Sequence, residues 1–241
     1  MRIVIWTSGD ADALELVQRI QRAIDGGQIS GTEIAAVFCN RRRGEDGETD
    51  EFLDWCVERQ LPAICVSYRE LRRERPADWR EELGREARSR LSGLGADLHL
   101  LVGYMLWLDD ETCEQLPLLN LHPALPGGPV GTWQEVIRQL MAQRATQTGA
   151  TMQLIRPGVE NRDQGTPVTF FRFPIARGMS FDQIRQQGFV REPFLLVETL
   201  RALAEGEIRI EGQRVIGPSG EPLAAGYDLT TTVDELLTQE K

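Results

Sequence analysis

Short apolar segments alternate with amphipathic, charged segments along the first half of the chain. Five segments are apolar over most of their length and are predicted to be strands: RIVIW (2–6), EIAAVFCN (33–40), AICVSY (63–68), DLHLLVGY (97–104) and PLLNLH (117–122). Nearly continuous apolar strands are typical of a sheet that is covered on both faces. Between the first two strands, apolar residues at helical spacing predict a helix that ends before Gly26.

A second helix is predicted in the charged segment before the fourth strand. Apolar residues recur there at every fourth position, namely Trp79, Leu83, Ala87 and Leu91. The Arg-rich remainder of this segment is expected to face solvent and to form i,i+4 ion pairs. This order of strands and helices predicts an α/β fold of the Rossmann-like kind, with an open, mostly parallel sheet and helices on both faces.

The second half of the chain continues the fold with a different pattern. Thr132 to Glu135 fits a capping box at the start of a helix, whose apolar face contains Val136, Ile137, Leu140 and Met141. Two more apolar segments (150–156 and 168–175) flank a polar loop, and a helix near 193–205 and a hairpin around Gly212 follow. We expect one domain over residues 1–226 and a polar C-terminal tail over 227–241.

Composition places the chain among ordinary globular proteins. It is 41% hydrophobic and 27% charged, with a net charge of −10, which does not favour nucleic acid or an anionic membrane as a partner. The opening apolar run is too short for a signal peptide, and no run approaches the ~20 residues of a membrane span. The four cysteines lack C-x-x-C spacing, so we expect buried thiols and a cytoplasmic protein.

Two scarce residue types narrow the chemistry. The single lysine is Lys241, which argues against a Walker-A nucleotide-binding protein, a protein kinase or a Schiff-base enzyme. The two histidines are His99, which lies inside a strand pattern, and His122. With so few histidines and no H-E-x-x-H motif, no metal site is expected.

The stretch LLNLHPALPGG (118–128) places the scarce His122 at the end of a predicted strand. Asn120 and His122 share one face of the strand because side chains alternate, and Pro123 ends the strand. An amide beside an imidazole can donate two hydrogen bonds to a developing oxyanion. A carboxylate is needed to orient the imidazole, and the loop at 157–167 offers Glu160 and Asp163, between which spacing alone does not decide.

These residues resemble those of the folate-dependent formyltransferases, and most closely the phosphoribosylglycinamide formyltransferases. The matching segments follow the family's order: IWTSG (5–9), AVFCN (36–40), LVGYM (101–105), NLHPAL (120–125), GAT (149–151) and DQGTPV (163–168). The resemblance continues to about Gly226 and covers nearly the whole chain. An N-x-H-P motif followed some forty residues later by an Asp-containing loop is a specific combination, whereas N-x-H-P alone is weak.

The resemblance implies a reaction and assigns roles to residues. An amine would attack the formyl carbon of the co-substrate 10-formyltetrahydrofolate, Asn120 and His122 would stabilise the oxyanion, and Asp163 would hold and charge His122. The family's folate site corresponds to Met105, Leu106, Trp107 and Leu108. Its amine-substrate site corresponds to Gly9, Asp10, Gly103, Pro123 and Glu192. Residues 1–100 would then form the amine-substrate half and 101–226 the catalytic and folate half.

The clearest departure from the family lies after the first strand. Phosphoribosylglycinamide formyltransferases have S-G-N-G-S-N there and hold a phosphate, whereas this chain has SGDADA (8–13). Asp10 and Asp12 would repel a phosphate if they face the site, or are simple helix-start residues. The basic segment Arg41-Arg42-Arg43 could compensate. Leu106 also stands where the family usually has Arg.

The expected function is formyl transfer to phosphoribosylglycinamide in purine biosynthesis, by a monomer or homodimer whose ligands are a small amine and folate. Three alternatives stay open. The acceptor could be another amine, such as an amino sugar or a non-phosphorylated metabolite. The protein could instead hydrolyse 10-formyltetrahydrofolate, or be a binding relative without activity.

Overall fold

The computed structural model describes residues 1–158 and 164–240. The chain divides into two compact units, Met1–Leu119 and Asn120–Lys241. The functional halves 1–100 and 101–226 that the family resemblance implies stay a prediction, since these units are defined by contacts alone. The first unit includes helix α5 (Asp110–Gln115), because this helix packs on helix α4 (Trp79–Leu91).

Four parallel strands form the sheet of the first unit. They are β1 (Arg2–Thr7), β2 (Glu33–Cys39), β3 (Ala63–Cys65) and β4 (Leu98–Leu101), in the order β4-β1-β2-β3. Trp6 of β1 lies opposite Phe38 on one side and Leu101 on the other. Because the strands are parallel, the loops after β1, β2 and β4 leave the sheet at the same edge.

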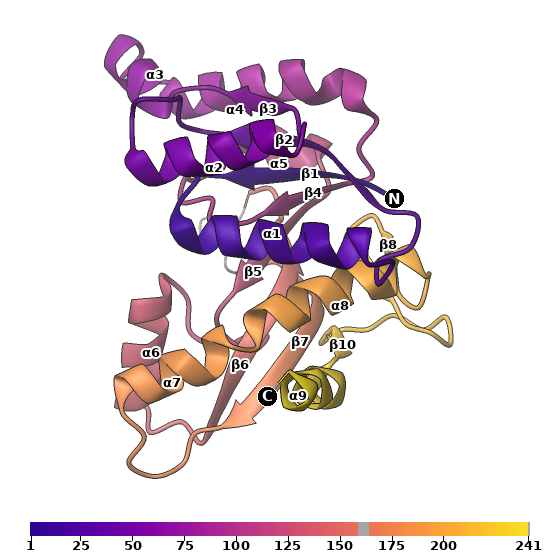
Figure 1. Cartoon of the computed structure of the whole chain (residues 1–241). Helices are drawn as coiled ribbons and strands as arrows, with labels where there is room; N and C mark the ends of the chain where they lie inside the picture. The colour runs from indigo at the N-terminus through magenta and orange to yellow at the C-terminus, as the bar shows by residue number, and fades with distance from the viewer. Residues whose placement is uncertain (159–163, 241) are drawn as a thin grey trace. The chain divides into compact units, whose positions relative to one another are not determined.

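Helices cover both faces of this sheet. Helices α1 (Ala11–Asp25) and α2 (Gly47–Glu58) lie on one face, and α3 (Tyr68–Glu74), α4 and α5 lie on the other (Figure 1). This division follows from right-handed crossovers, because the chain moves outward from β1 to β3 and then returns to β4. The predicted apolar residues of α4 are all buried, namely Trp79, Leu83, Ala87 and Leu91.

Two predicted strands are shorter than their apolar patterns suggested. β3 ends at Cys65, because Ser67 caps helix α3 by accepting a hydrogen bond from the Glu70 N–H. β4 ends at Leu101, because the chain turns at Gly103, which has a positive φ of 63°. The apolar residues beyond these points belong to helix starts and loops.

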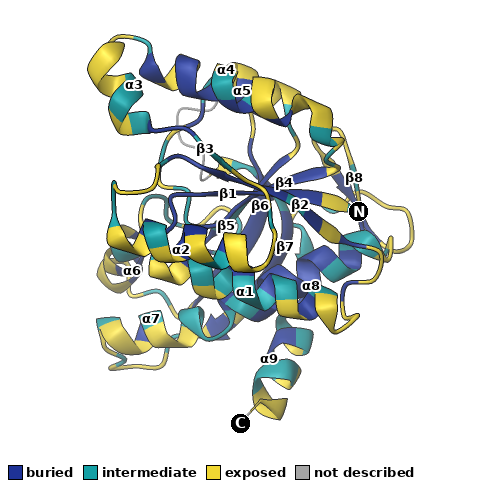
Figure 2. Cartoon of the chain, turned by 45° about the horizontal axis from the view of Figure 1, so that its top comes forward, coloured by how far each residue is buried: buried dark blue, intermediate teal, exposed yellow. Residues whose placement is uncertain are grey.

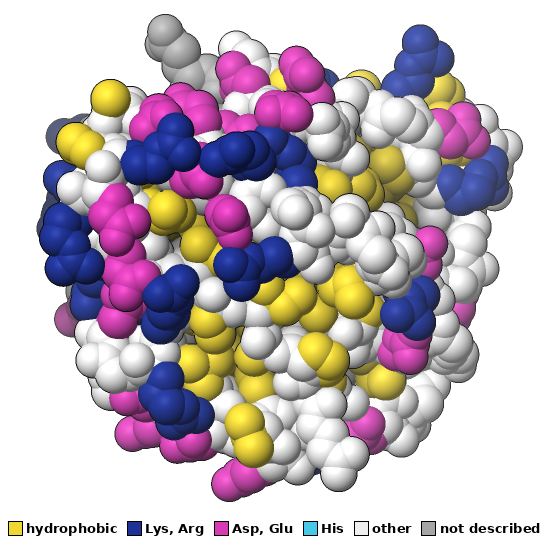
Figure 3. All heavy atoms as spheres, turned by 90° about the horizontal axis from the view of Figure 1, so that it is seen from above, with side chains coloured by type: hydrophobic (Ala, Val, Ile, Leu, Met, Phe, Trp, Pro, Cys, Tyr) yellow, Lys and Arg dark blue, Asp and Glu magenta, His cyan; other side chains and the backbone are white. Residues whose placement is uncertain are grey.

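The charged surface of α4 follows the predicted pattern. Arg90 pairs with Glu86 at 2.9 Å one helical turn away, and Arg88 pairs with Asp109 at 2.8 Å. Acidic and basic side chains are interspersed on the face drawn in Figure 3, with apolar side chains between them. Arg88 and Arg90 of α4 are therefore paired with carboxylates.

The second unit is built around an antiparallel pair, β6 (Gln147–Leu154) and β7 (Thr166–Pro174), next to the short parallel strand β10 (Tyr227–Asp228). Helix α8 (Glu192–Ala204) packs on β6 and β7, and most of its residues are buried (Figure 2). Strand β5 (Leu118–His122) carries the N-x-H-P motif. The remaining elements are α6 (Trp133–Ala142), α7 (Phe181–Phe189), the hairpin β8 (Arg209–Glu211) and β9 (Arg214–Ile216), and α9 (Thr230–Gln239).

The strand order β10-β7-β6-β5-β4-β1-β2-β3 confirms the predicted fold class of an open, mostly parallel sheet with helices. The capping box at Thr132 and Glu135 is also confirmed, although Met141 is exposed at 44%. The expected polar tail instead contains β10 and α9, and α9 buries Val233 against the second unit. In the described residues, no helix is long and apolar enough to span a membrane.

Candidate active site

Ser8 links the loops that follow β1, β2 and β4. Its N–H donates to the Gly103 carbonyl at 3.1 Å. Its hydroxyl accepts a hydrogen bond from Asn40 Nδ2 at 2.9 Å and another from the Met105 N–H at 3.2 Å. The family-matched segments of the first unit therefore meet around one buried hydroxyl.

Gly9 and Gly103, both predicted for the amine-substrate site, lie on either side of this link. Gly9 has a φ of +74°, and a Cβ there would lie 3.1 Å from Thr49 Cγ2. Gly103 has a φ of +63°, and its Cβ would lie 2.7 Å from the Ala13 Cβ. Any larger residue at either position would strain the backbone and displace helix α1 or α2.

Asp10 begins helix α1 as its N-cap. Its Oδ1 accepts a hydrogen bond from the Ala13 N–H at 2.8 Å, so the structure supports a helix-start role for this residue. Burial raises the pKa of the Asp10 carboxyl, the Ala13 N–H lowers it, and the neighbouring Asp12 and Glu48 raise it further. Glu48 Oε2 accepts from the Ala11 N–H at 3.3 Å, a contact that the sequence did not predict.

The three arginines after β2 are paired with the protein's own groups. Arg41 Nη1 lies 3.4 Å from Asp46 Oδ2 and 3.3 Å from Thr49 Oγ1. Arg42 pairs with Glu70, and Arg43 pairs with Asp54 at 2.8 Å. A phosphate would have to compete with these partners for Arg41 to Arg43.

The four residues predicted to bind folate differ in exposure. Leu108 is buried and Leu106 is partly buried, whereas Met105 and Trp107 are 67% and 48% exposed. Large apolar side chains at this exposure suit contact with an apolar or aromatic ligand. Met105 and Trp107 are therefore the better candidates for side-chain contact with folate, while Leu108 is part of the core.

In the second unit, His122 is buried at the end of β5, and its Nε2 lies 2.9 Å from the Pro129 carbonyl oxygen. Since a carbonyl oxygen only accepts, the imidazole must donate from Nε2. The ring can donate a second hydrogen bond only from Nδ1. That requires a proton on both ring nitrogens, which is the imidazolium form. The Pro129 carbonyl thus orients the ring and places a proton on Nε2.

Asn120 lies on the same strand with Leu121 between it and His122, and its side chain is partly buried. The loop after the strand is held by a hydrogen bond from Thr151 Oγ1 to the Ala124 carbonyl at 2.6 Å. A turn between Leu125 and Gly128 closes with an N–H to carbonyl distance of 2.8 Å. Asp163 lies outside the described residues, so its role beside His122 stays a prediction.

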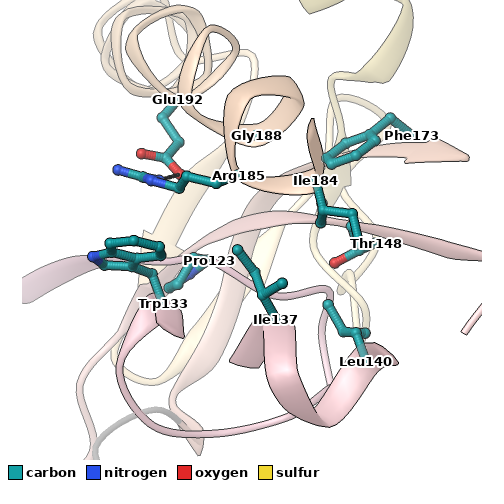
Figure 4. Close-up of a pocket in the computed structure, with 11 residues that line it drawn as sticks. Pro123, Trp133, Ile137, Leu140, Thr148, Phe173, Ile184, Arg185, Gly188 and Glu192 are labelled. Carbon is teal, nitrogen blue, oxygen red and sulfur yellow. Dashed lines mark hydrogen bonds and ion pairs between the residues drawn. The ribbon is translucent and has the colours of Figure 1, made fainter. Parts of the chain in front are cut away.

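Pro123 and Glu192, both predicted to bind the amine substrate, line one small pocket of the second unit (Figure 4). Its cavity volume is about 20 Å³, and most of its wall is apolar, including Ile137 and Ile184. Glu192 Oε1 accepts a hydrogen bond from Arg185 Nη1 at 2.9 Å, and the Arg185 guanidinium lies 4.8 Å from the Trp133 ring centroid. The sequence did not single out Arg185, because its partner is in the next helix.

His99 has a different environment, which is wholly structural. It is 3% exposed, and its Nδ1 accepts a hydrogen bond from Trp6 Nε1 at 2.9 Å. Burial lowers the pKa of His99 to about 4. Among the residues that the structure describes, no group of three or more His, Cys, Asp or Glu side chains could hold a metal ion.

Comparison with known proteins adds a family and a fold. The model of the formyl transferase family matches residues 1–200. A phosphoribosylglycinamide formyltransferase from Coxiella burnetii is 20% identical with a TM-score of 0.75, and the match covers 95% of this chain and 98% of that one. A glycinamide ribonucleotide transformylase from Symbiobacterium toebii is 24% identical with a TM-score of 0.70, over 89% of this chain and 92% of that one.

A formyltetrahydrofolate deformylase has a similar structure as well. The protein from Pseudomonas syringae is 20% identical with a TM-score of 0.68, and the match covers 90% of this chain and 65% of that one. At these identities the likeness shows a shared fold. Transferases and a hydrolase of the formyl group both have this fold, so the fold does not select between the two reactions.

Proposed function

The chain belongs to the formyl transferase family, and from this premise we propose that it transfers the formyl group of 10-formyltetrahydrofolate to a primary amine. The family uses formyltetrahydrofolate as its co-substrate, and the enzyme class of folate-dependent formyltransferase follows from the family. The acceptor amine and the residues that act on it belong to the proposal.

The observation that best supports this proposal is the fixed imidazole of His122. Its Nε2–H is held by the Pro129 carbonyl at 2.9 Å, and Asn120 lies two residues earlier on the same face of β5. The Asn120 amide and, in the doubly protonated ring, the Nδ1–H of His122 are donors on one strand face that can stabilise negative charge developing on a carbonyl oxygen. This is the requirement of acyl transfer to an amine.

In the proposed reaction, the amine nitrogen forms a bond to the formyl carbon, and the carbonyl oxygen becomes an oxyanion. The Asn120 amide and the Nδ1–H of the His122 imidazolium donate to this oxygen. The bond from the formyl carbon to folate N10 then breaks, N10 takes up a proton, and the new formamide nitrogen loses one. Asp163 is proposed to balance the imidazolium charge and to pass the amine proton to water.

The side chains of Met105 and Trp107 support the choice of co-substrate. Both are exposed on the loop after β4, where an aromatic pterin ring could pack on them. The Met105 N–H is already bonded to Ser8 Oγ at 3.2 Å. We therefore propose that this loop binds folate through apolar contact and through backbone groups other than that N–H.

Phosphoribosylglycinamide, in purine biosynthesis in the cytoplasm, is the acceptor predicted from the sequence. The similar fold of the enzymes from Coxiella burnetii and Symbiobacterium toebii is compatible with it. A non-phosphorylated amine is the second candidate, and the specific observation that favours it is the occupied start of α1, where Asp10 and Glu48 accept the Ala13 and Ala11 N–H groups.

One experiment separates transfer from hydrolysis and from simple binding. The protein is incubated with 10-formyltetrahydrofolate, and tetrahydrofolate formation is followed with phosphoribosylglycinamide, with other amines and without acceptor. Amine-dependent turnover is the expected result. Equal turnover without any amine would make the protein a hydrolase, and bound folate without turnover would make it a binding protein.

A further inference from the structure

The start of α1 is a place where an anionic group of a substrate would be expected. The helix follows β1 at the carboxyl edge of the parallel strands of the first unit. A helix start at such an edge offers backbone N–H groups and the positive end of the helix dipole. In this protein, its own carboxylates occupy that place.

Two carboxylates from different elements bind the first turn of α1. Asp10 Oδ1 accepts a hydrogen bond from the Ala13 N–H at 2.8 Å. Glu48, from α2, reaches across and accepts the Ala11 N–H with its Oε2 at 3.3 Å. Hydrogen bonds from a helix N-terminus to a carboxylate are charge-assisted, so an incoming anion would have to displace both groups.

The Asp10 carboxylate is also confined by its neighbours. A Cβ placed on Gly103 would lie 3.1 Å from Asp10 Oδ1 and 3.4 Å from Oδ2, so the carboxylate packs directly over this glycine. The Cβ of Ala13, in the same first turn, would lie 2.7 Å from the Cβ placed on Gly103. Gly103 therefore makes room for the Asp10 carboxylate.

The charge around this turn is unfavourable for an anion. Burial is the largest cause that raises the pKa of Asp10, and the charges of Asp12 and Glu48 raise it further. Arg41 acts in the opposite direction, but its guanidinium lies 3.4 Å from Asp46 Oδ2. A phosphate, which carries a charge of about −1.5 to −2, would meet the carboxylates of Asp10, Asp12 and Glu48. The one arginine that acts on this turn, Arg41, is already paired with the carboxylate of Asp46.

We propose that the amine acceptor carries no phosphate or other anionic group at the start of α1, and is therefore a non-phosphorylated amine. This inference rests on the proposed formyl transfer. The carboxylates of Asp10 and Glu48 determine substrate selectivity, because they favour binding of a neutral or cationic acceptor and repel the phosphorylated form of the same molecule.

The test uses pairs of acceptors that differ only in a phosphate. Glycinamide ribonucleoside is compared with its 5′-phosphate, and glucosamine with glucosamine 6-phosphate, with 10-formyltetrahydrofolate as donor. For each pair of which the protein formylates a member, kcat/KM is expected to be at least about tenfold higher for the amine without phosphate. A higher kcat/KM for the phosphorylated member would overturn the inference.

A second readout does not depend on activity. Binding of inorganic phosphate is measured by calorimetry on the wild type and on the double variant Asp10→Asn/Glu48→Gln, which removes both charges but keeps the oxygen acceptors. The wild type should show no saturable binding, and the variant should gain it. The matched control, Asp25→Asn/Glu58→Gln, removes the same charge from the far ends of the same helices and should leave phosphate binding unchanged.

These readouts separate the two hypotheses. If no amine is formylated, the proposed function fails, and phosphate binding alone decides whether the start of α1 is closed to anions. Saturable phosphate binding by the wild type would overturn the inference even if formyl transfer is confirmed. Circular dichroism checks the fold of both variants, and the wild-type measurements decide alone if either fails to fold.

Discussion

The two histidines of this protein are both buried in strands, yet their environments differ in a way that separates structure from chemistry. His99, in β4 of the first unit, accepts a hydrogen bond from Trp6 Nε1 at 2.9 Å, and burial lowers its pKa to about 4. His122, at the end of β5, donates from Nε2 to the Pro129 carbonyl at 2.9 Å. The His99 ring accepts a hydrogen bond from its neighbour, and the His122 ring donates one.

This difference shows which ring serves packing and which ring is oriented through its own N–H. A histidine whose ring nitrogen accepts from an indole N–H is stabilised in its neutral form and serves packing. A histidine whose Nε2–H is held by a backbone carbonyl has a fixed ring orientation, which is what a catalytic donor requires. Burial alone does not separate the two, since they are 3% and 4% exposed.

The largest expected effect comes from removing the reactive ring. His122→Ala should lower kcat for formyl transfer by about 10²- to 10⁴-fold, because the donor to the oxyanion and its charge are lost. Steady-state kinetics with 10-formyltetrahydrofolate measures this effect, and folate affinity should change little. His99→Asn serves as the control and should keep kcat within about threefold. A near-normal rate for His122→Ala would contradict the assigned role.

Removing the second donor should have a slightly smaller effect. Asn120→Ala should lower kcat by about 10²- to 10³-fold, the usual cost of one oxyanion donor. Asn120→Asp, which places a negative charge beside the oxyanion, should be at least as damaging. If kcat stays unchanged and only KM rises, Asn120 binds a substrate and does not stabilise the oxyanion.

For His99, the expected loss is in stability. His99→Ala should lower the free energy of unfolding by about 2–4 kcal/mol, because it leaves a cavity and an unpaired Trp6 N–H in the core. His99→Asn keeps an acceptor near the position of Nδ1 and should lose less. Urea unfolding measures both variants. An equal loss for the two would show that the hydrogen bond to Trp6 contributes nothing.

The last expected effect is a pH dependence of stability, of which only a part is seen at any pH between 4 and 6.5. The pKa of His99 falls from 6.5 to about 4 on folding, so the unfolded chain binds a proton between these values and the folded protein does not. This contribution is fully present above pH 6.5, declines as the pH falls towards 4, and amounts to about 3 kcal/mol. Urea unfolding across this range should show a shallower slope for His99→Asn than for the wild type, and parallel curves would exclude His99 as the cause.

The sequence predicted the parts of the fold that depend on local pattern. The apolar periodicity of α4, the capping box at Thr132 and the placement of Asn120 and His122 on one face of a strand all follow from residues close in the chain. The end of β3 at Cys65 was missed, because the capping by Ser67 outweighs the apolar pattern. Val233, Leu236 and Leu237 of helix α9 are apolar at helical spacing, but the polar residues around them made this pattern too weak to predict a helix.

Contacts between distant elements could not be predicted from the sequence. Glu48 binds the Ala11 N–H from 37 positions away, and no local pattern connects them. Arg185 reaches Glu192 because α7 and α8 pack on one another. The choice between Glu160 and Asp163 came from the family resemblance, and both lie outside the described residues.

The central claim is that this protein moves a formyl group onto an amine with His122 as a catalytic residue. The most direct measurement follows the carbon itself, by ¹³C NMR of reactions with 10-[¹³C]formyltetrahydrofolate and an amine acceptor. The account predicts that the label appears as a formamide with the wild type and that this signal is lost with His122→Ala. Label that appears as free formate at the same rate with and without the amine would contradict it.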